Sequence, residues 1–114
     1  MSHNTKIRSV HFRFDVAYGT DIEKAMAVIR QAVMDSEYSI PAWKGMNEYG
    51  PVYFIEYSDS SLQMATTVYY APTNPTEVVI SDINLRVDKA LRAAGIEIPF
   101  HYVSVVMKNN NAIE

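Results

Sequence analysis

Apolar and polar side chains alternate along residues 8–18, RSVHFRFDVAY. From Val10 to Tyr18 every second residue is apolar or aromatic, and a period of two over this length predicts a half-buried β-strand. Residues 52–57 and 62–71 predict two further strands by composition and alternation. The short SDSS segment between them predicts an antiparallel hairpin.

A helical period follows the first strand. Apolar residues recur three and four positions apart as far as Met34, which predicts an amphipathic helix. Thr20 and Glu23 have the spacing of a capping box at its N-terminus. Residues 35–51 then lose any period, with two prolines and two glycines. We expect Trp43 to anchor this loop to the core, and a contact surface for a partner is the alternative.

A second apolar stripe runs from Val79 to Ala94 and predicts a second amphipathic helix. Asn74 is its expected N-cap, and Gly95 stands where a left-handed C-cap residue belongs. Two strand-like segments, IEI and YVSVVM, lie on either side of Pro99. Proline has no N–H group to donate to a sheet, so we expect the chain to bend there or to lie at a sheet edge.

The predicted order is therefore β-α-β-β-α-β, which is typical of an α+β fold of the ferredoxin-like type. We expect a mostly antiparallel sheet with both helices packed on one face. The whole chain, 1–114, is expected to form a single domain whose core covers about 8–107.

Composition narrows the possible functions. The 114 residues are 48% hydrophobic, with a formal net charge of −3 and no cysteine. Disulfide scaffolds and thiolate metal sites are thereby excluded, and the charge disfavours binding to nucleic acid. No apolar run resembles a signal peptide or approaches the ~20 residues that span a bilayer. We therefore expect this domain to lie outside the membrane.

Candidate chemistry is sparse. The three histidines, His3, His11 and His101, lack the i, i+4 helical spacing of a zinc site. The Asp-Ser-Ser run at 59–61 is expected to form a hairpin turn, where such side chains bond the local backbone. Residues 52–71 carry tyrosines but no lysine or arginine, which disfavours RNA recognition. We expect no catalytic residue, no metal and no cofactor.

Three stretches in the same order resemble a known family. They are FDVAYGTDIEKAMAVIRQAV, EYSDSSL and LRAAG followed by IEIPF. Together they resemble the C-terminal cytoplasmic domain of small-conductance mechanosensitive (MscS-like) channels over roughly residues 8–107. The chain departs from the family pattern at Ser58, at Ala65 and Thr67, at His101-Tyr102, and through inserted residues in the loop 35–51.

The resemblance implies a piece of a longer membrane channel, with transmembrane helices and a β-rich middle domain before residue 1. Such channels are homoheptamers of the inner membrane that open under tension and release solutes during hypo-osmotic stress. This domain would lie on the cytoplasmic side, contribute to assembly and to a hollow cage, and catalyse nothing. As an isolated domain, a monomer or a weaker oligomer would be compatible with that role.

The alternative is a stand-alone ferredoxin-like module that binds a small ligand or oligomerises. An acylphosphatase-type enzyme is suggested by topology alone, and Asp21 in the first turn would repel phosphate. The residues that we single out as structural or interface candidates are Gly95, Pro99, Phe100, His101, Tyr102 and Trp43.

Overall fold

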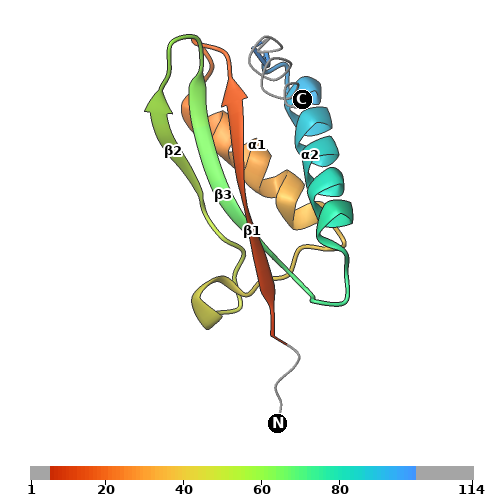
Figure 1. The fold of residues 1–114 in the computed structure, drawn as a ribbon. Coiled ribbons are helices and arrows are strands. Elements are labelled where there is room, and N and C mark those ends of the chain that lie inside the picture. Colours follow the sequence, from red (N-terminus) through yellow and green to blue (C-terminus); the bar gives the residue numbers. More distant parts are fainter. Residues whose placement is uncertain (1–5, 100–114) are drawn as a thin grey trace, which may run out of the picture.

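The computed structural model describes residues 6–99 of the chain. Its elements, in chain order, are β1 (Arg8–Val16), α1 (Ile22–Asp35), a short 3₁₀ helix η1 (Trp43–Gly45), β2 (Val52–Tyr57), β3 (Leu62–Tyr70) and α2 (Thr76–Ala93). The three strands predicted between residues 8 and 71 and both predicted helices are confirmed. Figure 1 shows the sheet and the two helices as two layers.

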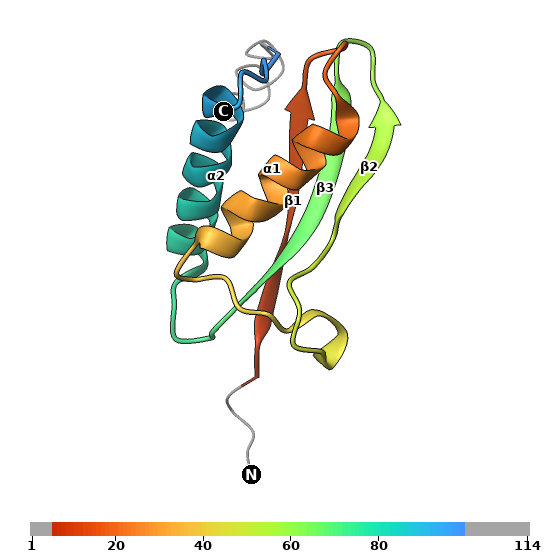
Figure 2. The ribbon, with the colours of Figure 1, turned by 180° about the vertical axis from the view of Figure 1, so that it is seen from behind.

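The sheet has the strand order β1-β3-β2, and both outer strands pair antiparallel with β3. The outer strands therefore run parallel to each other, and β1, α1 and β2 form a split β-α-β unit around β3. Both helices cover the same face of the sheet, as the two opposite views in Figures 1 and 2 show. The prediction of an antiparallel sheet with helices on one face is confirmed.

The strand predicted over 96–98 is absent, and these residues have no regular secondary structure. One backbone hydrogen bond, from the Ala17 N–H to the Glu97 carbonyl at 3.0 Å, ties this segment to the end of β1. Only three residues separate the helix-ending glycine from Pro99, which cannot donate to a ladder. The predicted strand at 102–107 lies outside the described residues, so residues 6–99 show a three-stranded α+β fold without the full ferredoxin-like topology.

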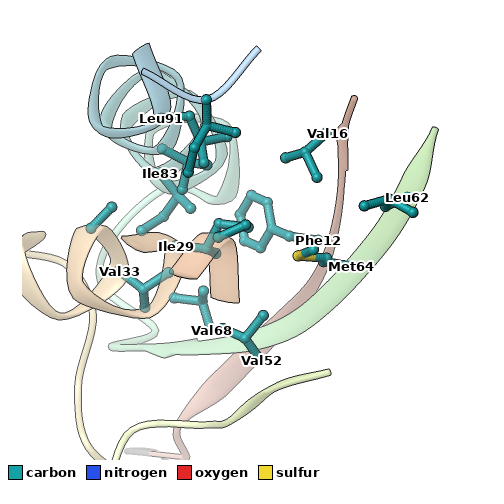
Figure 3. Close-up of a cluster of buried hydrophobic side chains, with 14 of the residues drawn as sticks. Phe12, Val16, Ile29, Val33, Val52, Leu62, Met64, Val68, Ile83 and Leu91 are labelled. Atoms are coloured by element: carbon teal, nitrogen blue, oxygen red, sulfur yellow. The ribbon is translucent and has the colours of Figure 1, made fainter. Parts of the chain in front are cut away.

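The core lies on the sheet face that the alternation of apolar and polar residues predicts. Every second residue of β3 is buried. The stripes of both helices pack onto this face, with Ile29 of α1 and Ile83 and Leu91 of α2 opposite Phe12 and Met64 of the sheet (Figure 3). Burial of this apolar surface is the main favourable term in folding.

The caps differ from those predicted. Helix α1 begins at Ile22, and the carboxylate of Asp21, not the Thr20 hydroxyl, accepts a hydrogen bond from the Lys24 N–H at 3.1 Å. The Thr20 N–H instead donates to the Ala17 carbonyl in the turn before the helix. Both side chains can cap a helix. The turn makes Asp21 the N-cap, because its carbonyl accepts the first hydrogen bond of the helix, from the Ala25 N–H.

Helix α2 begins one residue later than predicted. The carbonyl of Pro75 accepts hydrogen bonds from the N–H groups of Val78 and Val79, so Pro75 and not Asn74 is the N-cap. The Asn74 N–H donates to Ala71 in the preceding turn. A proline at the helix start costs no intrahelical hydrogen bond, because its missing N–H has no partner there.

The β2–β3 hairpin is closed by its serines. The Ser58 N–H donates to the Ser61 carbonyl at 2.8 Å, and the Ser61 N–H donates to the Ser58 hydroxyl at 3.2 Å. Ser61 is fully buried. The run at 59–61 therefore forms a turn, as predicted. The hydroxyl that bonds the local backbone there is that of Ser58, and the Ser61 hydroxyl is hydrogen-bonded to it.

Candidate functional site

The turn after α2 has the geometry expected of Gly95. Its φ is 75°, its N–H donates to the Arg92 carbonyl, and the Ile96 N–H donates to the Leu91 carbonyl at 2.9 Å. These two bonds form a Schellman motif, and the accompanying apolar contact is present because Ile96 and Leu91 both belong to the buried core. Gly95 is thus the left-handed residue that ends α2.

A cation from the other helix reaches the same turn. The Lys24 ammonium of α1 donates to the Ala94 carbonyl at 3.3 Å, at the C-terminal end of α2. This end of a helix carries partial negative charge, so a lysine there is favourable. The turn that ends α2 is therefore tied to the start of α1.

Pro99 lies where the chain leaves the described residues. With Ile98 it lines a cavity of about 250 Å³, whose other apolar walls are Phe14 of β1 and Val87 and Leu91 of α2. Pro99 therefore borders the seam between the end of β1 and α2. Phe100, His101 and Tyr102 lie outside the described residues.

Trp43 occupies the irregular loop between α1 and β2. It is half-buried and does not belong to the core cluster of residues 6–99. The Lys44 ammonium lies 4.8 Å from the centre of its ring, a cation–π contact. Trp43 therefore lies outside the core cluster, and the loop 35–51 is held by other contacts: Tyr38 packs against the core, and a backbone hydrogen bond joins the loop to β3.

The backbone contacts of this loop lie along β3. The Ile40 N–H donates to the Tyr69 carbonyl at 2.9 Å, beside the part of β3 that β2 does not reach. Further along, a Cβ on Gly50 would lie 2.7 Å from the Thr67 carbonyl oxygen, so the returning chain passes close to β3 there. The loop therefore lies against β3 at Ile40 and again at Gly50, and residues 41–49 connect these two contacts.

A polar cluster that the sequence-based predictions did not include links the two helices. Asp82 of α2 accepts hydrogen bonds from the buried Ser36 hydroxyl at 2.6 Å and from the Arg86 guanidinium at 2.8 Å. Partial burial acts to raise the pKa of Asp82, but the Ser36 hydrogen bond and then Arg86 outweigh it, and the pKa lies below its ordinary value. The hydrogen bond to Asp82 also raises the pKa of Arg86.

The i, i+4 spacing of Asp82 and Arg86 on one helix is a sequence signal for their ion pair. No sequence pattern indicates the contact with Ser36, which is 46 residues from Asp82 along the chain. Next to it, burial and then the charge of Glu37 raise the pKa of Tyr38. The cluster joins the end of α1 to the middle of α2. Because the pKa of Asp82 is lowered, its carboxylate is a weak base and does not activate the Ser36 hydroxyl as a nucleophile, which favours a structural role.

Several large exposed apolar and aromatic side chains gather on and beside β2. Tyr53, Ile55 and Tyr57 are 55%, 42% and 65% exposed. The Tyr57 ring packs edge-on against Phe54, with 5.1 Å between centroids, and stacks on Tyr18 at 6.3 Å. The Tyr18 hydroxyl donates to the Ser58 carbonyl. This ordered aromatic surface is typical of a protein contact site.

Within residues 6–99, no group of three or more histidine, cysteine, aspartate or glutamate side chains is arranged to hold a metal. His11 lies on the sheet face away from the helices, and its Nδ1 is 2.6 Å from the Thr67 hydroxyl. Neither helix of this range is long and apolar enough to cross a membrane.

Comparison with known proteins supplies a family. Residues 10–98 match the family described as "Mechanosensitive ion channel MscS, C-terminal". A small-conductance mechanosensitive channel of Helicobacter pylori is 28% identical over 97% of this chain. The chain spans 39% of the length of that protein.

Solved structures agree with this match. The crystal structure of Helicobacter pylori MscS in its closed state superposes with a TM-score of 0.73 at 28% identity, over 88% of this chain and 38% of that one. The cryo-EM structure of Arabidopsis thaliana MSL1 gives 0.65 at 11% identity, over 83% and 34%, which shows a shared fold. The chain therefore belongs to the family of MscS channel C-terminal domains, a family that is not enzymatic.

Proposed function

We propose that this chain is the cytoplasmic C-terminal domain of an inner-membrane channel, where it helps the subunits to assemble and forms part of a hollow cage below the pore. The complete channel would be a homoheptamer that opens under membrane tension and releases solutes during hypo-osmotic stress. The observation that carries the proposal is the family match over residues 10–98, together with the fold shared with a closed-state MscS structure.

The surface of the domain supports an assembly role. The largely apolar side chains of Tyr53, Ile55 and Tyr57 on β2 are exposed to water. Covering them with a partner would be favourable, because it removes apolar surface from water. Tyrosine is enriched in protein interfaces because its ring is apolar and its hydroxyl can still bond water or a partner. The β2 side of the sheet presents such residues.

The test compares the protein encoded by the complete gene with a version that lacks residues 6–114, both purified in the same detergent. We expect the complete protein to have the mass of a seven-subunit ring by native mass spectrometry. The truncated version should give a ring that dissociates at lower temperature, because the contacts of this domain add to those of the other domains. A monomeric complete protein, or equal ring stability with and without the domain, would refute the assembly role.

A further inference from the structure

A cavity of about 250 Å³ lies between the end of β1 and α2. Its apolar walls are formed by Phe14 of β1, Val87 and Leu91 of α2, and Ile98 and Pro99 of the segment after α2. The two α2 residues are almost fully buried, so the cavity reaches the edge of the core. An apolar cavity of about 150 Å³ can bind benzene, so this one has room for an aromatic ring.

Two charged side chains on the rim of the cavity already have partners. The Arg13 guanidinium donates a hydrogen bond to the Gln63 side chain at 3.1 Å. The Asp88 carboxylate accepts one from Arg92 at 3.0 Å. Because these groups are engaged and the walls are apolar, the cavity favours an apolar occupant over a charged ligand.

The segment next to the cavity turns alternate side chains toward the core. Ile96 is buried, Glu97 is exposed, and Ile98 packs against the core. In an extended chain, side chains two residues apart lie on the same side. Continued past Pro99, this alternation brings the side chain of Phe100 to the core side, next to the cavity.

The same segment runs alongside β1. The Ala17 N–H donates to the Glu97 carbonyl at 3.0 Å, and two residues later Pro99 lines the cavity together with Phe14. The chain therefore passes from the end of β1 back toward its middle. Pro99 has no N–H to donate, so backbone pairing with β1 is interrupted there and side-chain packing has to hold the chain.

We infer that the ring of Phe100 occupies this cavity and anchors the C-terminal segment to the seam between β1 and α2. Burial of the ring against apolar walls removes apolar surface from water. The occupant directly follows Pro99, a wall of the cavity, so little chain entropy is lost when it binds. The residues from His101 onward then leave the domain at a fixed point. This inference does not depend on the proposed function.

Thiol accessibility tests the anchor, because residues 1–114 contain no cysteine. The test uses the protein encoded by the complete gene, with any cysteine outside this stretch replaced by serine, and Val87→Cys places a thiol in the cavity wall. Without denaturant, a maleimide should label this thiol slowly, since the Phe100 ring covers it. Phe100→Ala should raise the labelling rate by roughly tenfold or more, and Phe100→Leu should raise it less. An unchanged rate in the Phe100→Ala variant would overturn the inference.

Two controls separate loss of the anchor from a general loss of structure. Ile83→Cys lies on the same buried stripe of α2, one turn earlier, and does not line the cavity. Its labelling rate should not change with Phe100→Ala, and a parallel rise at positions 83 and 87 would count against a local anchor. His101→Ala should leave the thiol at position 87 protected. A rise as large as that caused by Phe100→Ala would mean that Phe100 is not the specific occupant.

A photoreactive ring shows which chain supplies the occupant. p-Azidophenylalanine at position 100 keeps the ring and links, on illumination, to the atoms that touch it. We expect a link within one chain to the α2 peptide that holds Val87 and Leu91, with monomer mobility on a denaturing gel. Linked dimers would assign the occupant to a neighbouring subunit, and no link to α2 would place Phe100 outside the cavity. Either result would overturn the inference.

Native mass spectrometry of the same samples keeps this inference separate from the proposed function. A seven-subunit ring whose thiol at position 87 is labelled equally fast with and without the Phe100 ring would overturn the inference and leave the proposed function standing. Protection by Phe100 in a protein that forms no ring would uphold the inference and refute the assembly role.

Discussion

Gly95 gives α2 its end through backbone conformation alone. A Cβ at this position would have no atom within 4 Å, so space is not the constraint. The φ of 75° is the constraint, because side chains with a Cβ disfavour the left-handed region. We expect Gly95→Ala to lower the free energy of unfolding by roughly 1 kcal/mol or more, measured by urea denaturation.

Gly95→Asn is the matched control for this prediction. Asparagine tolerates the left-handed region better than alanine, so its loss of stability should be smaller. Equal losses for the two variants would mean that something other than the backbone angle makes glycine necessary at this turn.

Gly50 is required for the opposite reason. A Cβ there would lie 2.7 Å from the Thr67 carbonyl oxygen, which belongs to the central strand and cannot move freely. Gly50→Ala should therefore destabilise the fold by about 1–3 kcal/mol, the usual cost of overpacking. Gly45→Ala is a useful comparison, because a Cβ at that position meets no atom within 4 Å and its cost arises from φ alone. A neutral Gly50→Ala variant in thermal denaturation would contradict the close approach of loop and strand.

At the level of elements, the Ser36–Asp82–Arg86 cluster joins the two helices and should make stability depend on pH. The folded-state pKa of Asp82 is lowered, so its carboxylate stabilises the fold above the ordinary aspartate pKa, and that contribution is lost as pH falls through the lowered value. Asp82→Asn should cost roughly 1 kcal/mol near pH 7, with a smaller difference from the unaltered protein near pH 3, measured by urea denaturation at each pH.

Asp88 provides the control. It forms an i, i+4 ion pair with Arg92 whose side chains are both well exposed. Exposed pairs contribute little, so Asp88→Asn should change stability by a few tenths of a kcal/mol at most. If Asp82→Asn had an effect as small as Asp88→Asn, the contact with Ser36 would not contribute to holding α1 against α2.

Sequence patterns predicted the helices and strands well where the same face of the element is buried along its whole length. The alternation of β3 and the stripe from Val79 to Leu91 both correspond to buried faces. Helix starts were placed wrongly by one or two residues. Neighbouring residues at each start could serve as caps, and the preceding turns, with the Thr20–Ala17 and Asn74–Ala71 hydrogen bonds, determined which residue did. The strand expected at 96–98 was wrong, since apolar alternation over three residues also suits the buried Ile96 of a Schellman turn.

At the scale of the whole molecule, the family could be recognised from three short stretches, but the contact surfaces could not be located. Alternation tells which side chains share a face of a strand, and it does not tell which strands form the edges. Only the order β1-β3-β2 shows that β1 and β2 lie at opposite edges of one sheet. The Ser36–Asp82 contact was hidden for a similar reason, because it joins segments far apart in sequence.

We propose that this domain belongs to a channel gated by membrane tension. The most direct measurement is patch-clamp recording from liposomes that contain only the protein encoded by the complete gene, while suction on the pipette is increased. We expect discrete conductance steps that appear above a threshold of tension and disappear when suction is released. Intact patches that contain the protein and stay silent up to the tension at which they rupture would contradict the account.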